Sequence, residues 1–175
     1  MGVCFFRMIL SDRDILLELR DESLKIIPKP SIIQPASVDL MLGDSIKSLD
    51  GDTWNLNNGR YVLKPHEFVL ASTYEHVEIP DYLVGIVDGK SSLGRLGIMV
   101  HVTAGYIDPG FKGNITLELY NCSNQNFRLN KRMPICQLVL EQLSSKCINP
   151  YGTKGLNSHY QNSKGTVYSK YNNGE

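Results

Sequence analysis

The chain has 175 residues, and its 18 Lys and Arg balance 18 Asp and Glu, so the net charge is zero. With 42% hydrophobic residues, this length predicts one globular domain with a sizeable core and excludes wholesale disorder. The balanced charge argues against a nucleic-acid-binding surface, and no apolar run approaches the roughly 18 residues of a membrane helix. We therefore expect a soluble protein.

Cysteine and histidine spacing gives no sign of a metal site. No C-x-x-C pair occurs among Cys4, Cys122, Cys136 and Cys147, so we expect free thiols in a reducing compartment, with the cytoplasm as the location. The histidines show no zinc-ligand spacing, and we expect no zinc. Residues 1–7 are interpreted as an N-terminal extension, because they are too short for a secretion signal and Met8 can serve as a start.

The first predicted element is a helix that begins after Ser11. Ser11 is a good N-cap and Asp14 follows three residues later. The apolar stripe of this helix consists of Ile15, Leu16 and Leu19.

Beyond Pro28 and Pro30, short apolar stretches separated by Gly, Pro, Asn and Asp predict antiparallel strands. The candidates are 61–63, 67–72, 83–87, 98–102, 114–120 and 135–140. Many short strands with one or two helices favour a β-barrel or jelly roll, which we place at residues 8–150. The polar residues 151–175 are expected to form a tail that either frays or orders over a ligand.

Three segments are candidates for chemistry. Residues 89–97 place glycines and serines around Lys90 and Arg95, which is typical of a polar turn or of an anion-binding loop. Residues 103–113 contain three glycines and a proline and predict a tight turn or bulged hairpin, with Asp108 as a turn residue. Residues 115–120 alternate between apolar and polar, which puts Glu118 on the face opposite Leu117. That carboxylate faces either water or a polar site, where it would suit a general base.

Together these motifs resemble the dCTP deaminase family of the dUTPase-like superfamily. The resemblance runs from Met8 to about Lys164. Besides the segments above, it includes Gln34-Pro35-Ala36-Ser37-Val38-Asp39-Leu40, Pro134-Ile135-Cys136-Gln137-Leu138, Tyr151-Gly152 and Ser158-His159-Tyr160-Gln161. It implies a distorted β-barrel that assembles as a homotrimer, with each active site shared between neighbouring subunits.

The resemblance also implies roles for individual residues. Glu118 matches the glutamate that takes a proton from water for attack on the ring carbon bearing the cytosine amine. Ser91 matches a residue that positions this water, and Arg95 matches the arginine that orients the glutamate. The implied nucleotide-binding residues are Lys90, Ser92, Ala104, Asp108, Thr116, Leu117, Gln137, Tyr151, His159 and Ser163.

The implied ligands are dCTP as substrate, dTTP as feedback inhibitor, and Mg²⁺ held mainly by phosphate oxygens and water, without zinc. The tail differs from the family pattern, because His159 and Ser163 stand where Lys and Gln are usual at the triphosphate.

Gly105 and Tyr106 resemble the bifunctional members of the family, which also cleave between the α- and β-phosphates. The expected function is therefore deamination of dCTP that continues to dUMP and diphosphate, in the synthesis of pyrimidine deoxynucleotides. The alternative is a monofunctional deaminase that releases dUTP and ammonia. More remote is a plain dUTPase, which would keep Asp108 and the serine loop but would not need Glu118 and Arg95. A non-catalytic nucleotide sensor is also remote because Ser91, Arg95 and Glu118 are all present, and a structural jelly roll would leave the three polar segments without a purpose.

Overall fold

The computed structural model describes residues 8–171 of the chain. The predicted N-terminal extension, residues 1–7, lies outside the described residues, and so does Cys4. Within residues 8–171, no helix is long and apolar enough to cross a membrane.

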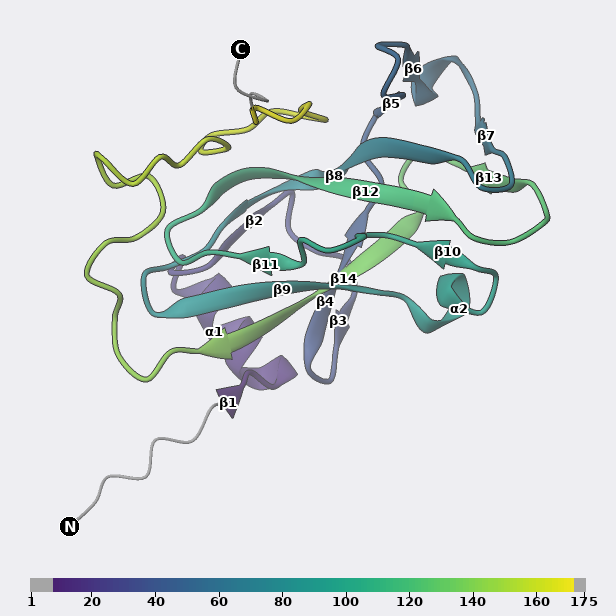
Figure 1. Ribbon diagram of the computed structural model, residues 1–175. Helices are drawn as coiled ribbons and strands as arrows, with labels where there is room; N and C mark the ends of the chain where they lie inside the picture. Colours follow the sequence, from purple (N-terminus) through teal and green to yellow (C-terminus); the bar gives the residue numbers. More distant parts are fainter. Residues whose placement is uncertain (1–7, 172–175) are drawn as a thin grey trace.

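Two six-stranded sheets and a two-stranded ribbon make up the structure (Figure 1). The first sheet has the order β11 (Tyr106–Ile107), β9 (Leu83–Gly89), β14 (Pro134–Gln142), β4 (Ser37–Met41) and β3 (Ile33–Gln34), with β1 (Met8–Ile9) beside β14. The second has the order β10 (Ile98–Met99), β12 (Lys112–Asn121), β8 (Phe68–Glu78), β5 (Ser45–Lys47) and β6 (Thr53–Asn55), with β2 (Lys25–Ile27) beside β8. The ribbon pairs β13 (Phe127–Leu129) with β7 (Tyr61–Leu63). This mainly β, barrel-like arrangement confirms the predicted fold class.

The helices are few and short: α1 (Asp12–Arg20), α2 (Ser91–Gly94) and the 3-10 turn η1 (Leu56–Asn58). The predicted cap of α1 is confirmed, because the Ser11 hydroxyl accepts a hydrogen bond from the backbone N–H of Asp14 at 3.4 Å. Ile15 is fully buried and Leu19 packs against the core, but Leu16 is 54% exposed. The apolar stripe is thus narrower than predicted, because residues 15 and 19 share one helix face and residue 16 points about 100° away.

The strand predictions hold for position more than for length. The strand predicted at 98–102 ends at Met99, because the chain bends at Val100 and the N–H groups of Val102 and Thr103 bond to the Glu118 side chain. Residues 103–113 contain the predicted turn at Asp108, where the carbonyl accepts from the N–H of Phe111 at 3.1 Å. The hairpin prediction is wrong, because β11 pairs with β9 while β12 pairs with β8. The turn therefore carries the chain from one sheet to the other.

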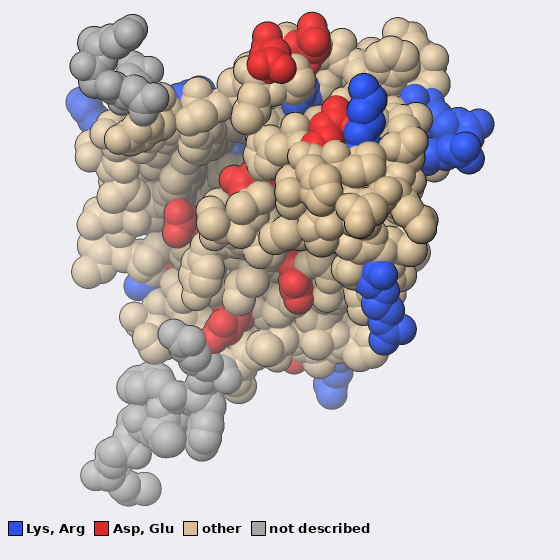
Figure 2. Space-filling view, turned by 45° about the vertical axis from the view of Figure 1, so that its right-hand side comes forward, with Lys and Arg blue, Asp and Glu red and all other residues tan. Residues whose placement is uncertain are grey.

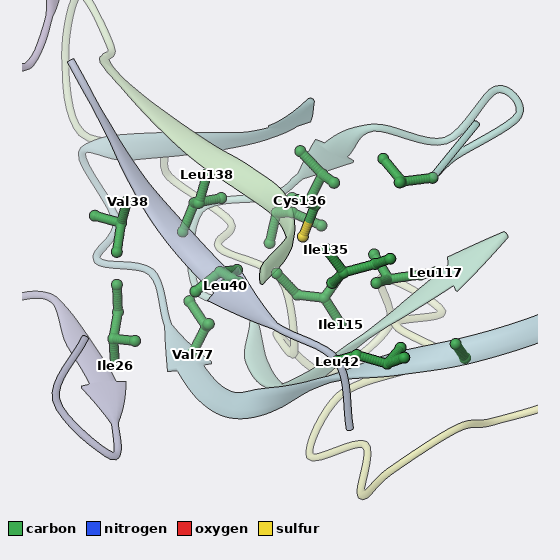
Figure 3. Packing of buried hydrophobic residues seen from close by; sticks show 14 of the residues in the cluster. Ile26, Val38, Leu40, Leu42, Val77, Ile115, Leu117, Ile135, Cys136 and Leu138 are labelled. Atoms are coloured by element: carbon green, nitrogen blue, oxygen red, sulfur yellow. The ribbon is translucent and has the colours of Figure 1, made fainter. Parts of the chain in front are cut away.

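The core lies between the two sheets. Figure 3 shows apolar side chains from β2, β4, β8, β12 and β14 pointing toward one another. On β12 the predicted alternation is confirmed, since Ile115, Leu117 and Leu119 are all buried while the residues between them are half-buried. The packing of β12 therefore determines which of its side chains can reach the opposite face.

The described cysteines, Cys122, Cys136 and Cys147, are free, as expected. Burial raises the pKa of the Cys136 thiol, and the carboxylates of Glu75 and Asp39 add to the increase. A raised pKa keeps the reactive thiolate scarce at neutral pH, so Cys136 is a packing residue of the core.

Truncating Leu119 tests the contribution of β12 to the core. We expect Leu119→Ala to lower the free energy of unfolding by about 2–5 kcal/mol, because it leaves a cavity at a fully buried position. Urea unfolding measures this change. The control is Leu16→Ala, where the leucine is exposed and the loss should be small. Equal losses in both variants would contradict this description of the core.

Candidate active site

Glu118 lies in the middle of β12, half-buried, on the face opposite the core. Its Oε2 accepts backbone hydrogen bonds from Val102 at 2.9 Å and Thr103 at 3.4 Å. Among the described residues, these two donors alone bond the carboxylate, so Oε1 makes no hydrogen bond to them. A rigid strand and two backbone donors together orient this group, as general acid–base chemistry requires.

The carboxylate lines a cavity of about 850 Å³. Its walls come from β8, β11, β12 and the tail. The predicted site residues that the structure brings together here are Ala104, Tyr106, Asp108, Thr116, Glu118, Tyr151, His159 and Ser163. Residues far apart in sequence thus meet in one cavity of a size suited to a small ligand.

The charge of this cavity does not match that of a polyphosphate. Its described lining contains the carboxylates of Asp108 and Glu118 and no Lys or Arg. Figure 2 shows acidic and basic side chains scattered over one face of the molecule, with uncharged residues covering most of it. A triphosphate bound here would therefore need cations from outside the lining.

The tail is ordered over the cavity (yellow in Figure 1). The Gln161 side chain connects it to the barrel, accepting from the N–H of Lys112 at 2.9 Å and donating to the carbonyls of Gly110 and Tyr151. Ser163 forms a β-bridge with Gly113. These contacts hold the tail against the barrel beside the cavity, and its closing over a ligand stays a prediction.

The predicted serine and arginine loop lies elsewhere. Ser91 and Ser92 begin the single turn of α2, and Arg95 follows it. Arg95 lines a second cavity of about 580 Å³ formed by residues 94–97 and 122–127, which shares no lining residue with the first. One chain thus does not bring Ser91 and Arg95 into the cavity that holds Glu118.

Lys90 and Gln137 form part of a separate polar cluster at the start of this loop. The Lys90 ammonium lies 2.6 Å from Oδ2 of Asp39, whose side chain is only 3% exposed. The Gln137 amide donates to the Gly89 carbonyl at 3.4 Å and accepts from the Ser37 hydroxyl at 3.3 Å. The cluster therefore ties β4 and β14 to the loop that carries Ser91 and Arg95.

Asp39 was not predicted as a member of this cluster, although the sequence contained a signal for it. It stands between Val38 and Leu40, and a carboxylate within an apolar strand has to find a partner when it is buried. What the sequence could not show is that its partner is Lys90, 51 positions further along the chain.

Two other predicted residues have constrained surroundings. The Leu117 side chain is buried in the core, so any contact that it makes with a nucleotide would be through its backbone. A Cβ atom added at Gly105 would lie 2.9 Å from the Val87 carbonyl and 3.3 Å from the His101 ring. A larger residue at 105 therefore requires the segment to shift, whereas Tyr106 is 61% exposed at the cavity wall.

We expect Asp39→Asn to lower the free energy of unfolding by about 1–3 kcal/mol, because the buried side chain loses its ion pair with Lys90. Chemical unfolding measures this loss. The matched control is Asp21→Asn, which breaks the exposed Arg20–Asp21 pair and should change little. If Asp39→Asn lowered the free energy of unfolding as little as the control does, the contact between Lys90 and Asp39 would not hold the loop.

Solved structures with similar folds identify the architecture. The 2′-deoxycytidine 5′-triphosphate deaminase from Agrobacterium tumefaciens aligns with a TM-score of 0.67 and 20% identity, covering 78% of this chain and 48% of that one. The EIAV dUTPase aligns with a TM-score of 0.54 and 20% identity, covering 75% and 98%. The chain therefore has a dUTPase-like fold.

Sequence comparison narrows this class to one family. A family model described as dCTP deaminase-like matches residues 9–143. The protein named dCTP deaminase, dUMP-forming, of Dictyoglomus thermophilum is 45% identical, with 94% of this chain and 95% of the relative covered. The protein of the same name from Methanosphaera stadtmanae is 41% identical, with 93% of this chain and 93% of the relative covered. This chain belongs to the dCTP deaminase-like family.

Proposed function

We propose that this protein is a dCTP deaminase that carries its substrate on to dUMP and diphosphate. The observation that carries the proposal is the Glu118 carboxylate, which lines the cavity and is held by two backbone N–H groups through one of its oxygens. The names of the relatives that are 40–45% identical supply the substrate and the product.

In the proposed reaction Glu118 acts as general base and then as general acid. It takes a proton from water, and the hydroxide bonds to the ring carbon that bears the cytosine amine. Glu118 then passes the proton to that amine, the C–N bond breaks and ammonia leaves. The proton of the new hydroxyl group moves to the adjacent ring nitrogen, so one water is consumed, one ammonia leaves and the cytosine ring becomes uracil.

Ser91 and Arg95 complete this site from a neighbouring subunit of a homotrimer. Two observations support the sharing: the two cavities of one chain have no lining residue in common, and the one that contains Glu118 lacks Lys and Arg. Arg95 then orients Glu118 and stabilises charge at the reacting centre, while Ser91 positions the water.

The phosphates and the sugar occupy the rest of the shared site. Lys90 and Ser92 lie on the loop at the triphosphate, with Gln137, Tyr151, His159 and Ser163 as further phosphate or sugar contacts, and Asp108 near the deoxyribose. Ala104, Thr116 and the backbone of Leu117 lie beside the base.

Mg²⁺ suits a cavity whose acidic residues are Asp108 and Glu118, because the ion neutralises phosphate charge while phosphate oxygens and water hold it. dTTP, which shares the sugar and the triphosphate, is expected to inhibit at the same place, and the cytoplasm is the expected location.

Asp108, Gly105 and Tyr106 support the second step, cleavage between the α- and β-phosphates. Asp108 and Tyr106 line the same cavity as Glu118, so one bound nucleotide can meet both carboxylates. The close approach of Gly105 to the Val87 carbonyl explains why this segment takes no bulkier residue without moving. Asp108 would place the water that attacks the phosphate.

Replacing the carboxylate tests the first step. We expect Glu118→Gln to lower ammonia release from dCTP by at least about a hundredfold, because an amide cannot take the proton. The amide oxygen can still accept from Val102 and Thr103, so folding and dCTP binding should persist. Glu22→Gln, on the exposed surface, is the control. Near-normal ammonia release from Glu118→Gln would show that another group is the base.

Product analysis of the purified protein with dCTP and Mg²⁺ tests the complete proposal. We expect dUMP, diphosphate and ammonia without accumulation of dUTP. Accumulating dUTP would instead establish the monofunctional deaminase. Turnover of dUTP without turnover of dCTP would identify a dUTPase and contradict deamination itself.

A further inference from the structure

The tail runs beside the face of β12 that carries Glu118. The Gly165 N–H donates to the Asn114 side-chain oxygen at 3.0 Å. Two residues further along both segments, the Val167 N–H donates to the Thr116 hydroxyl at 3.3 Å. The side chains at 114, 116 and 118 share one face of the strand, because alternate residues of a strand point the same way. Each step of two residues along the tail therefore matches a step of two along β12.

Contacts on the other side of the tail, with β5, advance in the same way. The Thr166 hydroxyl donates to the Ser45 carbonyl at 2.9 Å, and the Lys47 ammonium lies 4.6 Å from the centroid of the Tyr168 ring. The strand register puts Lys47 and Glu118 on either side of the same residue of β8. With Tyr168 at Lys47, the tail has therefore reached the level of Glu118.

Ser169 is the next residue of this series on the side of β12. The chain makes no turn or bend between Val167 and Lys170, and Ser169 lines the same cavity as Glu118. Backbone N–H groups of alternate residues in an extended chain point to the same side, so the Ser169 N–H points toward β12 as the two tail donors before it do. One further step of the series puts this N–H beside the Glu118 carboxylate.

A donor and an acceptor at this level both lack a protein partner. Among residues 8–171, the Ser169 N–H donates no hydrogen bond and Oε1 of Glu118 accepts none, while Oε2 is held by Val102 and Thr103. Water can serve both groups in an open cavity, but a nucleotide that displaces this water leaves them in need of each other. A carboxylate oxygen has two lone pairs, so Oε1 can accept from the tail and still take a proton.

We propose that the backbone N–H of Ser169 donates to Oε1 of Glu118 when a nucleotide fills the cavity, which makes Ser169 a positioning residue for the general base. The inference rests on the proposed function, because it gives the tail a part in the reaction of Glu118. Backbone donors from the segment at 102–103 and from the tail then fix both carboxylate oxygens.

Proline at position 169 removes the donor, whereas alanine keeps it. We expect Ser169→Pro to lower kcat for ammonia release from dCTP by roughly three- to tenfold, the size of one net hydrogen bond, with a smaller change in KM. Ser169→Ala should keep both constants, because its N–H is intact. Tyr171→Pro is the matched control, since Tyr171 is 80% exposed and outside the described lining of the cavity, and it should keep the wild-type kcat.

Glu118→Asp separates a contact with the carboxylate from a general effect of the tail. The shorter side chain draws the carboxylate back from the tail, so Ser169→Pro should cost little further kcat in this background. The same loss as in the wild-type background would overturn the inference, and so would an unchanged kcat or a rise in KM alone in Ser169→Pro. An equal loss in Ser169→Ala would also overturn it, because the hydroxyl would then be the donor.

A cysteine pair tests the placement without the reaction. We expect mild oxidation to join Glu118→Cys and Ser169→Cys in one chain, as shown by mass mapping of the linked peptides, because neighbouring segments bring Cβ atoms within reach of a disulfide. Glu118→Cys with Lys154→Cys should stay unlinked, since Lys154 is exposed and outside the described lining.

This pair also separates failure of the inference from failure of the proposed function. Wild-type protein that does not deaminate dCTP, together with a linked 118–169 pair, would reject the reaction and leave Ser169 beside Glu118. An unlinked 118–169 pair would overturn the inference whatever the activity of the wild type.

Discussion

The pleat of β12 is the constraint on which the site depends. Its apolar residues Ile115, Leu117 and Leu119 are buried in the core, and a shift of register by one residue would drive Glu118 into that core. The free energy of core burial therefore also fixes the direction of the carboxylate. The backbone donors of Val102 and Thr103 then set its orientation, and the early end of β10 brings them there.

The other proposed site residues are divided between two surfaces of the chain. The surface with Glu118 has carboxylates, aromatic rings and the ordered tail, whereas the loop with Ser91 and Arg95 lies beside another cavity. Asp39, through Lys90, holds this loop to the first sheet. Such a division is what the proposed trimer requires, because each surface supplies the charge that the other lacks.

Sequence reasoning recovered the features that carry a strong local signal. The Ser11 cap, the alternation in β12 and the turn at Asp108 each depend on near neighbours, and each is present. Several strands of two or three residues, such as β1, β3 and β11, are too short to show a period and were missed, although β7 was predicted with its observed bounds. The hairpin prediction failed because pairing across two sheets is set by the whole barrel. The Lys90–Asp39 ion pair and the contact of Lys47 with the Tyr168 ring join residues that are far apart in the sequence, and no local pattern encodes such contacts.

The most direct test of the account is complementation between two inactive variants, Glu118→Gln and Arg95→Ala. Each variant is first expressed alone, and the two are then co-expressed. If neighbouring subunits share each site, co-expressed chains form some sites with both an intact Glu118 and an intact Arg95, and activity on dCTP returns to about a quarter of wild type for random mixing. If the mixture stays as inactive as either variant alone, the two residues act within one chain, and the shared site is wrong.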